Sequence, residues 1–358
     1  MQIYILLFSL ICIFGYVFLL KCRDKKAFVV CSFFAMSLVL GLRGETVGED
    51  TLHYLEVFDA LSDLSWKTIL TSGIHVVWDP IWNQKVELFY AILSKLISCF
   101  TGNGHVLIFV VSSLTCLLWG RFIYKNVYSH VFVATLFILC DSFFMGAFNA
   151  ARQLLALAII VNAYEFLASK EYGKILLISL TAFMVHNSAI VILLLYGLCT
   201  IGNRKSGVLL TCAAVVAVVL GFPLIIRIVS VVLPRYSVYF EVNYWEPNSL
   251  RGTLILWAVE IVISLCIFTS GIKDQEEYSG IIGLLLYIAV ELMGQRVVAL
   301  GRLSYYFRFF TVMLFPSFIK RLVEESKLIF YFALITLFVM EYLSYAGTPF
   351  RTYSFLWS

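Results

Sequence analysis

Residues 27–42 read AFVVCSFFAMSLVLGL and run directly into RGETVGEDTLHY at residues 43–54. The first stretch carries no charge, whereas the second is polar, contains two glycines and holds several ionisable side chains. A long uncharged apolar run is typical of a helix buried in a membrane. The boundary at residue 42 therefore predicts the end of a membrane helix, and we interpret residues 43–54 as the rim of a site outside the cytoplasm.

The composition of the whole chain supports a membrane protein. Of its 358 residues, 61% are hydrophobic and 13% are charged, whereas soluble domains carry about 25% charged residues. At about 20 residues per span, the chain has room for roughly 10 to 13 membrane segments and for no soluble domain. Because the apolar runs lack the alternation of a barrel, the sequence predicts an all-α, polytopic helical bundle that forms one integral membrane domain over residues 1–358.

Charge and cysteine content exclude several other classes of protein. The net charge of +4 is what a positive cytoplasmic face produces, and it gives no reason to expect nucleic acid binding. The nine cysteines lie mostly inside apolar runs without a C-x-x-C pair, which favours packing residues over disulfides. No histidines have metal-ligand spacing, so the sequence predicts neither a metal site nor a cofactor.

Basic connections predict the topology, because the positive-inside rule places them in the cytoplasm. They lie at residues 21–26, 121–125, 170–174, 204–205 and 320–327. Loops 43–83 and 234–252 are then extracytoplasmic, and the second is rich in aromatic residues that could stack on sugars or belong to an interfacial belt.

Two irregular segments follow from this topology. Residues 86–100 would be re-entrant or interfacial, and 174–201 would be broken near His186 and return to the same side. In the competing topology, one basic loop violates the rule and both segments cross conventionally.

Arginines near the outer ends of helices are the first candidate site residues. Arg152, followed by Gln153, opens a predicted helix, and Arg302 and Arg308 lie near the start of another. A guanidinium binds phosphoryl oxygens through two parallel hydrogen bonds. The alternative is that each arginine extends to lipid headgroups.

His186 and the acidic residues of 43–54 are the other candidates. His186 is the one histidine within a predicted span, where it could donate to a phosphate or move a proton, or act only as a packing residue. Asp50, with Glu45 and Glu49, is well placed to act as general base on a sugar hydroxyl. The alternative is a solvated acidic loop whose charge only keeps it outside.

Four short runs, in order along the chain from residue 43 to about residue 316, carry a family resemblance. They are Arg43, Gly48, Asp50 and Tyr54 in R-x4-G-x-D-x3-Y; Arg152, Gln153 and Ala156 in R-Q-x-x-A; His186, Ser188 and Ala189 in H-x-S-A; and Arg302 with Tyr305, Tyr306 and Phe307 before Pro316. Asp79-Pro80 stands where the family often has Glu-Pro. In these runs the sequence resembles the EpsG-like and Wzy-type O-antigen or exopolysaccharide polymerases.

The resemblance implies a metal-independent membrane glycosyltransferase of the GT-C type. Such an enzyme transfers the growing glycan from undecaprenyl pyrophosphate to the non-reducing-end hydroxyl of a new lipid-linked repeat unit. It would lie in the bacterial inner membrane among membrane lipids, with its active site facing the periplasm. A flippase and a chain-length regulator would be its partners. The resemblance implies this reaction class and leaves the sugars, the linkage and the stereochemistry open.

The residues and the resemblance together give a hypothesis for the site. Arg152 and Arg302, with Arg43 and His186, would bind the donor pyrophosphate. Asp50 would be the general base, or would instead orient Arg43. The remaining predicted substrate-binding residues are Gln153, Tyr54, Tyr305, Arg308 and Glu45. Two alternatives remain, namely a flippase-like transporter of the same lipid-linked oligosaccharide and a ligase or acyltransferase acting on the same glycans.

Overall fold

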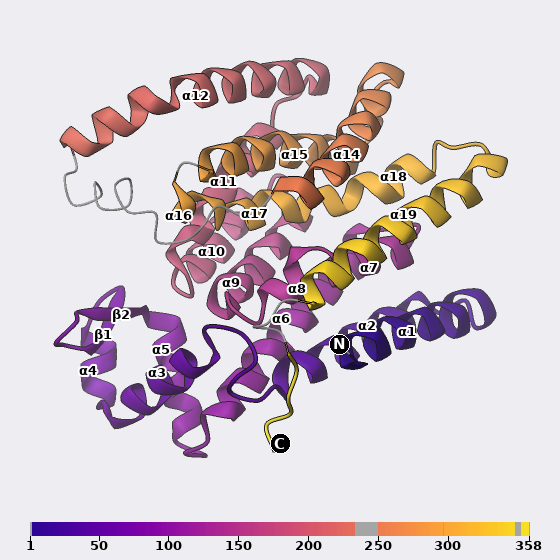
Figure 1. Cartoon of the computed structure of the whole chain (residues 1–358). Helices are drawn as coiled ribbons and strands as arrows, with labels where there is room; N and C mark the ends of the chain where they lie inside the picture. The colour runs from indigo at the N-terminus through magenta and orange to yellow at the C-terminus, as the bar shows by residue number, and fades with distance from the viewer. Residues whose placement is uncertain (1, 233–249, 296, 348–351, 358) are drawn as a thin grey trace. The chain divides into compact units, whose positions relative to one another are not determined.

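The computed structural model describes residues 2–232, 250–295, 297–347 and 352–357 (Figure 1). Helices dominate the described residues, and the regular β-structure among them is one two-stranded sheet. The predicted all-α membrane fold is therefore confirmed. Residues 234–249 of the predicted aromatic loop 234–252 lie outside the described residues.

Five helical segments of the described chain are long and apolar enough to cross a membrane. They are Gln2–Lys21, Gly104–Asn126, Arg204–Ile228, Gln275–Gly294 and Glu324–Ala346. Shorter apolar helices cover Leu88–Ser98, Val131–Gly146, Tyr172–Phe183, Asn187–Cys199 and Leu254–Ser270. This pattern is that of a multi-pass membrane protein.

A sharp basic turn separates the first two helical segments. Helix α1 (Gln2–Phe14) continues as the π-helix η1 (Gly15–Lys21), and α2 (Lys25–Gly41) follows. Arg23 takes a left-handed backbone conformation with φ of 55°, and the Asp24 carboxylate accepts a hydrogen bond from the Ala27 N–H at 2.9 Å. This N-cap begins α2 directly after the turn.

Helix α2 packs along α6 (Gly104–Asn126), and small residues allow the close approach. A Cβ atom on Gly120 would lie 3.1 Å from the ring of Phe33, and one on Gly41 would lie 2.7 Å from the ring of Phe109. The end of α2, which lies two residues before Arg43, is therefore held against the start of α6.

The predicted extracytoplasmic loop 43–83 contains regular secondary structure, and its position outside the cytoplasm stays a prediction. It contains α3 (Thr51–Asp63), α4 (Trp66–Thr71) and β1 (His75–Asp79), and β1 pairs antiparallel with β2 (Gln84–Glu87). Asp79 accepts hydrogen bonds from the N–H groups of Ile81 and Trp82 at 2.9 and 3.2 Å, so the Asp-Pro pair shapes the hairpin turn.

The two irregular segments are short or broken, as predicted. Helix α5 (Leu88–Ser98) covers only 11 residues. The run 174–201 divides into α10 (Tyr172–Phe183), the short 3₁₀-helix η3 (Asn187–Val191) and α11 (Ile192–Cys199). Whether either segment is re-entrant stays a prediction.

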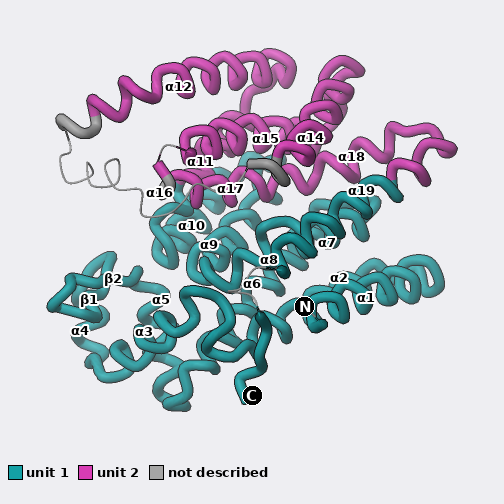
Figure 2. The backbone as a smooth tube through the Cα atoms, in the orientation of Figure 1, with its two compact units in different colours: residues 1–190, 331–358 teal, residues 191–330 magenta. Residues whose placement is uncertain are grey.

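Internal packing divides the chain into two compact units (Figure 2). The first unit comprises residues 1–190 and 331–358, and the second comprises residues 191–330. The prediction of one integral membrane domain stays a prediction.

The remaining helices complete these units. They are α7 (Val131–Cys140), α8 (Ser142–Gly146), α9 (Ala151–Val161) and η2 (Asn162–Phe166), then α12 (Arg204–Val232), α14 (Leu250–Ser270), α15 (Gln275–Gly294), α16 (Val298–Gly301), α17 (Ser304–Arg308), η5 (Phe309–Met313), α18 (Leu314–Ile319) and α19 (Glu324–Ala346).

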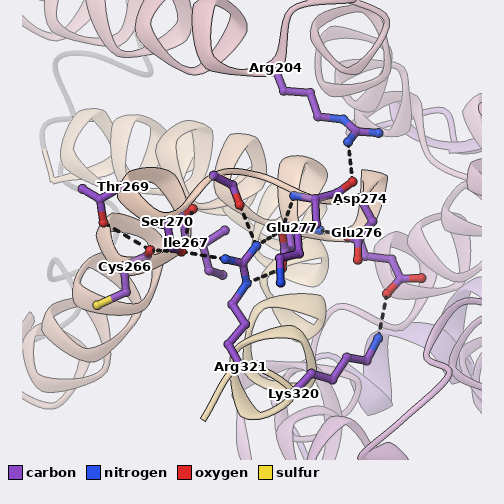
Figure 3. Close-up of polar contacts among 12 residues, drawn as sticks. Arg204, Cys266, Ile267, Thr269, Ser270, Asp274, Glu276, Glu277, Lys320 and Arg321 are labelled. Atoms are coloured by element: carbon purple, nitrogen blue, oxygen red, sulfur yellow. Dashed lines mark hydrogen bonds and ion pairs between the residues drawn. The ribbon is translucent and has the colours of Figure 1, made fainter.

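A dense set of polar contacts joins three helix ends of the second unit (Figure 3). Arg321, just after α18, donates to both carboxylate oxygens of Glu277 at 2.7 and 2.5 Å. It also donates to the Ser270 hydroxyl at 2.6 Å. Because Ser270 ends α14 and Glu277 lies in the first turn of α15, this bidentate pair stabilises the ends of α14, α15 and α18 against one another.

Candidate active site in the first unit

Arg43 lies at the end of α2 and is completely buried. Its Nε donates to the Thr51 hydroxyl at 3.0 Å and its Nη1 to the Leu40 carbonyl at 2.9 Å. The Nη2 group has no hydrogen-bond partner within the described residues. Burial lowers the pKa of Arg43 to about 10, so the guanidinium stays charged at neutral pH.

The Arg43 charge has no carboxylate partner in the part of the chain that the structure describes. Its guanidinium carbon lies 5.5 Å from the centre of the Phe148 ring, and its hydrogen bonds go to neutral oxygens. A buried cation without a counter-ion is costly unless an anion binds it. The unpartnered Nη2 is therefore a candidate anchor for an anionic ligand.

Tyr54 fixes the 43–54 segment against the turn that precedes α9. Its hydroxyl donates to the Asn149 carbonyl at 2.7 Å and accepts from the Ala151 N–H at 3.0 Å. The Glu49 N–H donates to the Asn149 side-chain oxygen at 2.9 Å. The R-x4-G-x-D-x3-Y run is thus held beside the start of α9 at two points.

Gly48 has a steric reason to be glycine. Its φ is +86°, and an added Cβ would lie 2.5 Å from the Phe148 carbonyl oxygen. Side chains rarely adopt this backbone conformation, and the space for one is taken. Gly48 therefore allows the segment to approach the turn before α9.

Asp50 lies two residues after this glycine, at the N-cap position of α3. Its side chain is half-buried and makes no capping hydrogen bond. Its carboxylate forms no ion pair with any residue that the structure describes. Glu45 and Glu49 are exposed to solvent. Of the three predicted carboxylates, Asp50 is thus the one that is both sheltered and available.

Arg152 lies in the first turn of α9 and pairs with a carboxylate that sequence reasoning missed. Its Nη1 donates to Glu87 Oε2 at 3.0 Å, with the two side chains 21% and 9% exposed. Its guanidinium carbon also lies 5.6 Å from the centre of the Tyr90 ring. Glu87 neutralises the Arg152 charge and fixes the direction of its guanidinium.

Glu87 continues the polar contacts to the break near His186. Its Oε1 accepts from the Asn187 N–H at 3.3 Å, and the Asn187 amide nitrogen lies 2.6 Å from His75 Nε2. The His186 Nδ1 lies 2.7 Å from the Ser188 hydroxyl. The broken segment is therefore connected to Arg152 through one carboxylate.

Three charged groups act on the Tyr54 phenol. Burial raises the pKa of Tyr54, and the Asp50 carboxylate raises this pKa further, whereas Arg152 and Arg43 lower it. One carboxylate and two guanidiniums therefore act electrostatically on the same phenol, which the hydrogen bonds above hold beside the start of α9. We call Tyr54, Asp50, Arg43, Arg152 and Glu87 the Tyr54 cluster.

The other predicted site residues have different surroundings. Gln153 is buried beside Arg152 in α9. In the second unit, Arg302 is exposed and Tyr305 is half-buried. Arg308 is buried, forms an ion pair with Glu260 and lies 4.8 Å from the Tyr287 ring centre. Their roles in substrate binding stay predictions, as does a cavity shared with the Tyr54 cluster.

Metal ligands do not gather anywhere in the described ranges. No group of three or more His, Cys, Asp or Glu side chains there could hold a metal ion. The charged chemistry of the Tyr54 cluster is instead that of guanidiniums and carboxylates.

One comparison decides the family. The model of the EpsG family matches residues 26–355 of the 358. The chain belongs to the EpsG family. No curated protein and no solved structure matches it. Because the match includes the segment 43–54, helix α9 and the break near His186, all members of the Tyr54 cluster lie within the EpsG-family region.

Family membership supports a polysaccharide-polymerase-like role in the membrane, carried out by a glycosyltransferase-like enzyme on a lipid-linked oligosaccharide. For an EpsG-family chain, the Tyr54 cluster offers the two kinds of group such a reaction needs. A carboxylate can accept a proton, and guanidiniums can bind phosphate.

Proposed function

We propose that this chain is a polysaccharide polymerase. In the proposed reaction, the growing O-antigen or exopolysaccharide is transferred from undecaprenyl pyrophosphate to the non-reducing-end hydroxyl of a new lipid-linked repeat unit. The hydrogen bonds that hold the 43–54 segment, with Arg43 and Asp50, beside the start of α9, which carries Arg152, are the observation that carries this proposal. This arrangement supplies a base and two cations within one unit of the fold.

Asp50 acts as the general base. Its carboxylate takes the proton of the acceptor hydroxyl, whose oxygen attacks the anomeric carbon of the donor's reducing-end sugar. The bond between that carbon and the pyrophosphate oxygen breaks, and undecaprenyl pyrophosphate leaves. The half-buried setting of Asp50 and its lack of a capping bond support this role, because a base must reach the proton that it removes.

Arg43 and Arg152 neutralise the leaving pyrophosphate. Negative charge develops on the phosphate oxygens as the bond breaks, and fixed guanidiniums lower the barrier by binding that charge. Arg43 has an unpartnered Nη2, and Glu87 holds Arg152 in place. Arginines perform this neutralisation in the proposal, without a metal ion.

The remaining predicted residues have supporting roles in this proposal. His186 donates to the pyrophosphate, and Gln153, Glu45 and the second-unit residues Arg302, Tyr305 and Arg308 contact the donor or the acceptor. The site faces the periplasmic side of the bacterial inner membrane. A flippase supplies the lipid-linked repeat units, and a chain-length regulator limits the product.

Purified protein incubated with an already lipid-linked repeat unit tests the proposal. The wild-type protein is expected to produce a ladder of longer chains on gels. Asp50→Asn removes the base, and Arg152→Ala removes one phosphate-binding cation. Each change is expected to reduce the ladder by at least about 100-fold, which is within the usual range for a general base or a fixed charge donor.

Asp59→Asn is the matched control, because Asp59 is an exposed carboxylate on helix α3, which begins directly after Asp50. It should leave the ladder unchanged. A full ladder from both site variants would refute the proposed roles of Asp50 and Arg152. A wild-type protein that moves the lipid-linked unit across a bilayer but makes no ladder would instead be a transporter, and attachment of finished glycan to another acceptor would indicate a ligase.

A further inference from the structure

A basic pocket lies at the turn between the first two helical segments, away from the Tyr54 cluster. It is open, has a volume of about 550 Å³ and is lined by residues 23–26 together with Tyr124, Lys125 and Tyr128. Pockets of roughly 300–1,000 Å³ accommodate small molecules and headgroups. Its lining brings four cationic side chains together with one carboxylate.

Lys25 forms the fixed wall of this pocket. Its ammonium group donates to the carbonyls of Tyr124 and Val127, both at 2.7 Å. It also lies 5.1 and 5.9 Å from the ring centres of Tyr124 and Tyr128. Because it binds the last carbonyls of α6, Lys25 holds the basic turn against the end of that helix.

Three further cations line the pocket without a partner. Arg23, Lys26 and Lys125 are exposed, and none forms an ion pair or hydrogen bond with a described side chain. The one carboxylate, that of Asp24, caps α2 through the Ala27 N–H. The pocket therefore keeps an unneutralised positive charge that suits a phosphate-bearing anion.

Two candidate membrane spans end beside the pocket, and the end of a membrane helix is where lipid headgroups lie. The two spans are Gln2–Lys21 and Gly104–Asn126. Basic pockets between helices at such ends recognise anionic lipid headgroups, and tyrosines are enriched at the same depth. A soluble phosphate would be attracted by the same charges, but it would gain nothing from this position at the membrane surface.

We propose that this pocket binds the headgroup of an anionic phospholipid. In this assignment the phosphate contacts Arg23, Lys26 and Lys125, and the two tyrosines flank the glycerol portion. The site is separate from the proposed polymerase reaction, so the two proposals stand or fall independently.

The test uses the full-length protein in detergent and native mass spectrometry during titration with phosphatidylglycerol or phosphatidylcholine. The pocket variant carries Lys26→Gln with Lys125→Gln. The control variant carries Lys170→Gln with Lys205→Gln, which removes the same charge from two other exposed lysines in basic connections. A conservative variant, Lys26→Arg with Lys125→Arg, keeps the charge.

The pocket variant is expected to bind phosphatidylglycerol roughly 30-fold more weakly, because each lysine near an anionic surface contributes about a 5-fold change. The control variant should stay within about 2-fold of wild type. The conservative variant should bind at least as tightly as wild type, because arginine keeps the charge and can bind a phosphate through two hydrogen bonds. None of the three variants should alter the weaker binding of phosphatidylcholine.

Three results would overturn the assignment. One is an equal loss in the pocket and control variants, which would mean that only total charge matters. Another is equal binding of the two lipids by the wild-type protein. The third is displacement of bound phosphatidylglycerol by sn-glycerol 3-phosphate at the same concentration as the lipid, which would assign the pocket to a soluble phosphate.

Discussion

Replacing Glu87 by Gln removes the charge that holds Arg152 while keeping the size of the side chain. The pair joins Arg152 Nη1 to Glu87 Oε2 at 3.0 Å, and the side chains are 21% and 9% exposed. Breaking a fully buried pair costs about 3–5 kcal/mol, whereas an exposed pair contributes about 0–1 kcal/mol. For this partly buried pair we expect Glu87→Gln to destabilise the fold by about 2 kcal/mol.

A double-mutant cycle isolates the pair from its surroundings. Glu87→Gln, Arg152→Gln and the double variant would be compared by equilibrium unfolding in mixed detergent–SDS micelles. Because each single variant leaves a charge without its partner, the double variant should cost less than the sum, with a coupling energy of about 1–2 kcal/mol. In the Arg121–Glu165 pair of the same unit, the side chains are 40% and 22% exposed, so its coupling should stay below about 1 kcal/mol.

The polymerisation rate provides a second, independent measurement of the effect of Glu87→Gln. If Glu87 positions Arg152, the polymerisation rate of Glu87→Gln should fall by about 10- to 100-fold, because a displacement of about 1 Å at a reacting centre has effects of that size. Additive effects of the two substitutions, within about 0.5 kcal/mol, would refute the coupling. An unchanged rate in Glu87→Gln would refute the positioning role.

Two further substitutions test how the 43–54 segment is held. Tyr54→Phe removes a buried hydroxyl and leaves the Ala151 N–H unpaired, so the free energy of unfolding should fall by about 1–3 kcal/mol; unchanged stability would contradict this. Gly48→Ala should lower the free energy of unfolding by about 2 kcal/mol or more, because the φ of Gly48 is +86° and the new Cβ would lie 2.5 Å from the Phe148 oxygen. Gly73 has a similar φ of +78°, but open space surrounds the position of an added Cβ. Gly73→Ala should therefore lower the free energy of unfolding by only about 1 kcal/mol. Equal effects of the two substitutions would contradict the steric argument.

The composition and the local pattern of apolar residues were sufficient to predict the helical membrane fold. The lack of charge in residues 27–42 predicted a helix that ends before Arg43, and α2 ends at Gly41. The polar residues near His186 predicted a break, which the structure contains between α10 and η3. Such features depend on neighbours within one or two turns, so the sequence records them directly.

The contacts that build the Tyr54 cluster could not be predicted in the same way. Glu87 pairs with Arg152, 65 residues away along the chain, and nothing in the sequence around residue 87 points to this partner. The acidity of 43–54 left a solvated loop open as an alternative, and it gave no sign that apolar residues of the following helix, such as Phe58 and Leu61, are completely buried. Pairing across long separations is set by packing, which local patterns do not contain.

The ion pairs separate Arg43, Arg152 and Arg308 into two kinds. Glu87 neutralises Arg152, and Glu260 neutralises Arg308, so an incoming phosphate must compete with a carboxylate that is already bound. Arg43 meets no such competition among the described residues, because its partners are neutral oxygens and an aromatic ring. Its desolvation penalty has already been met on folding, so a phosphate that reaches Nη2 gains an interaction strengthened by burial. Of the two arginines in the Tyr54 cluster, Arg43 should therefore contribute more to binding the pyrophosphate.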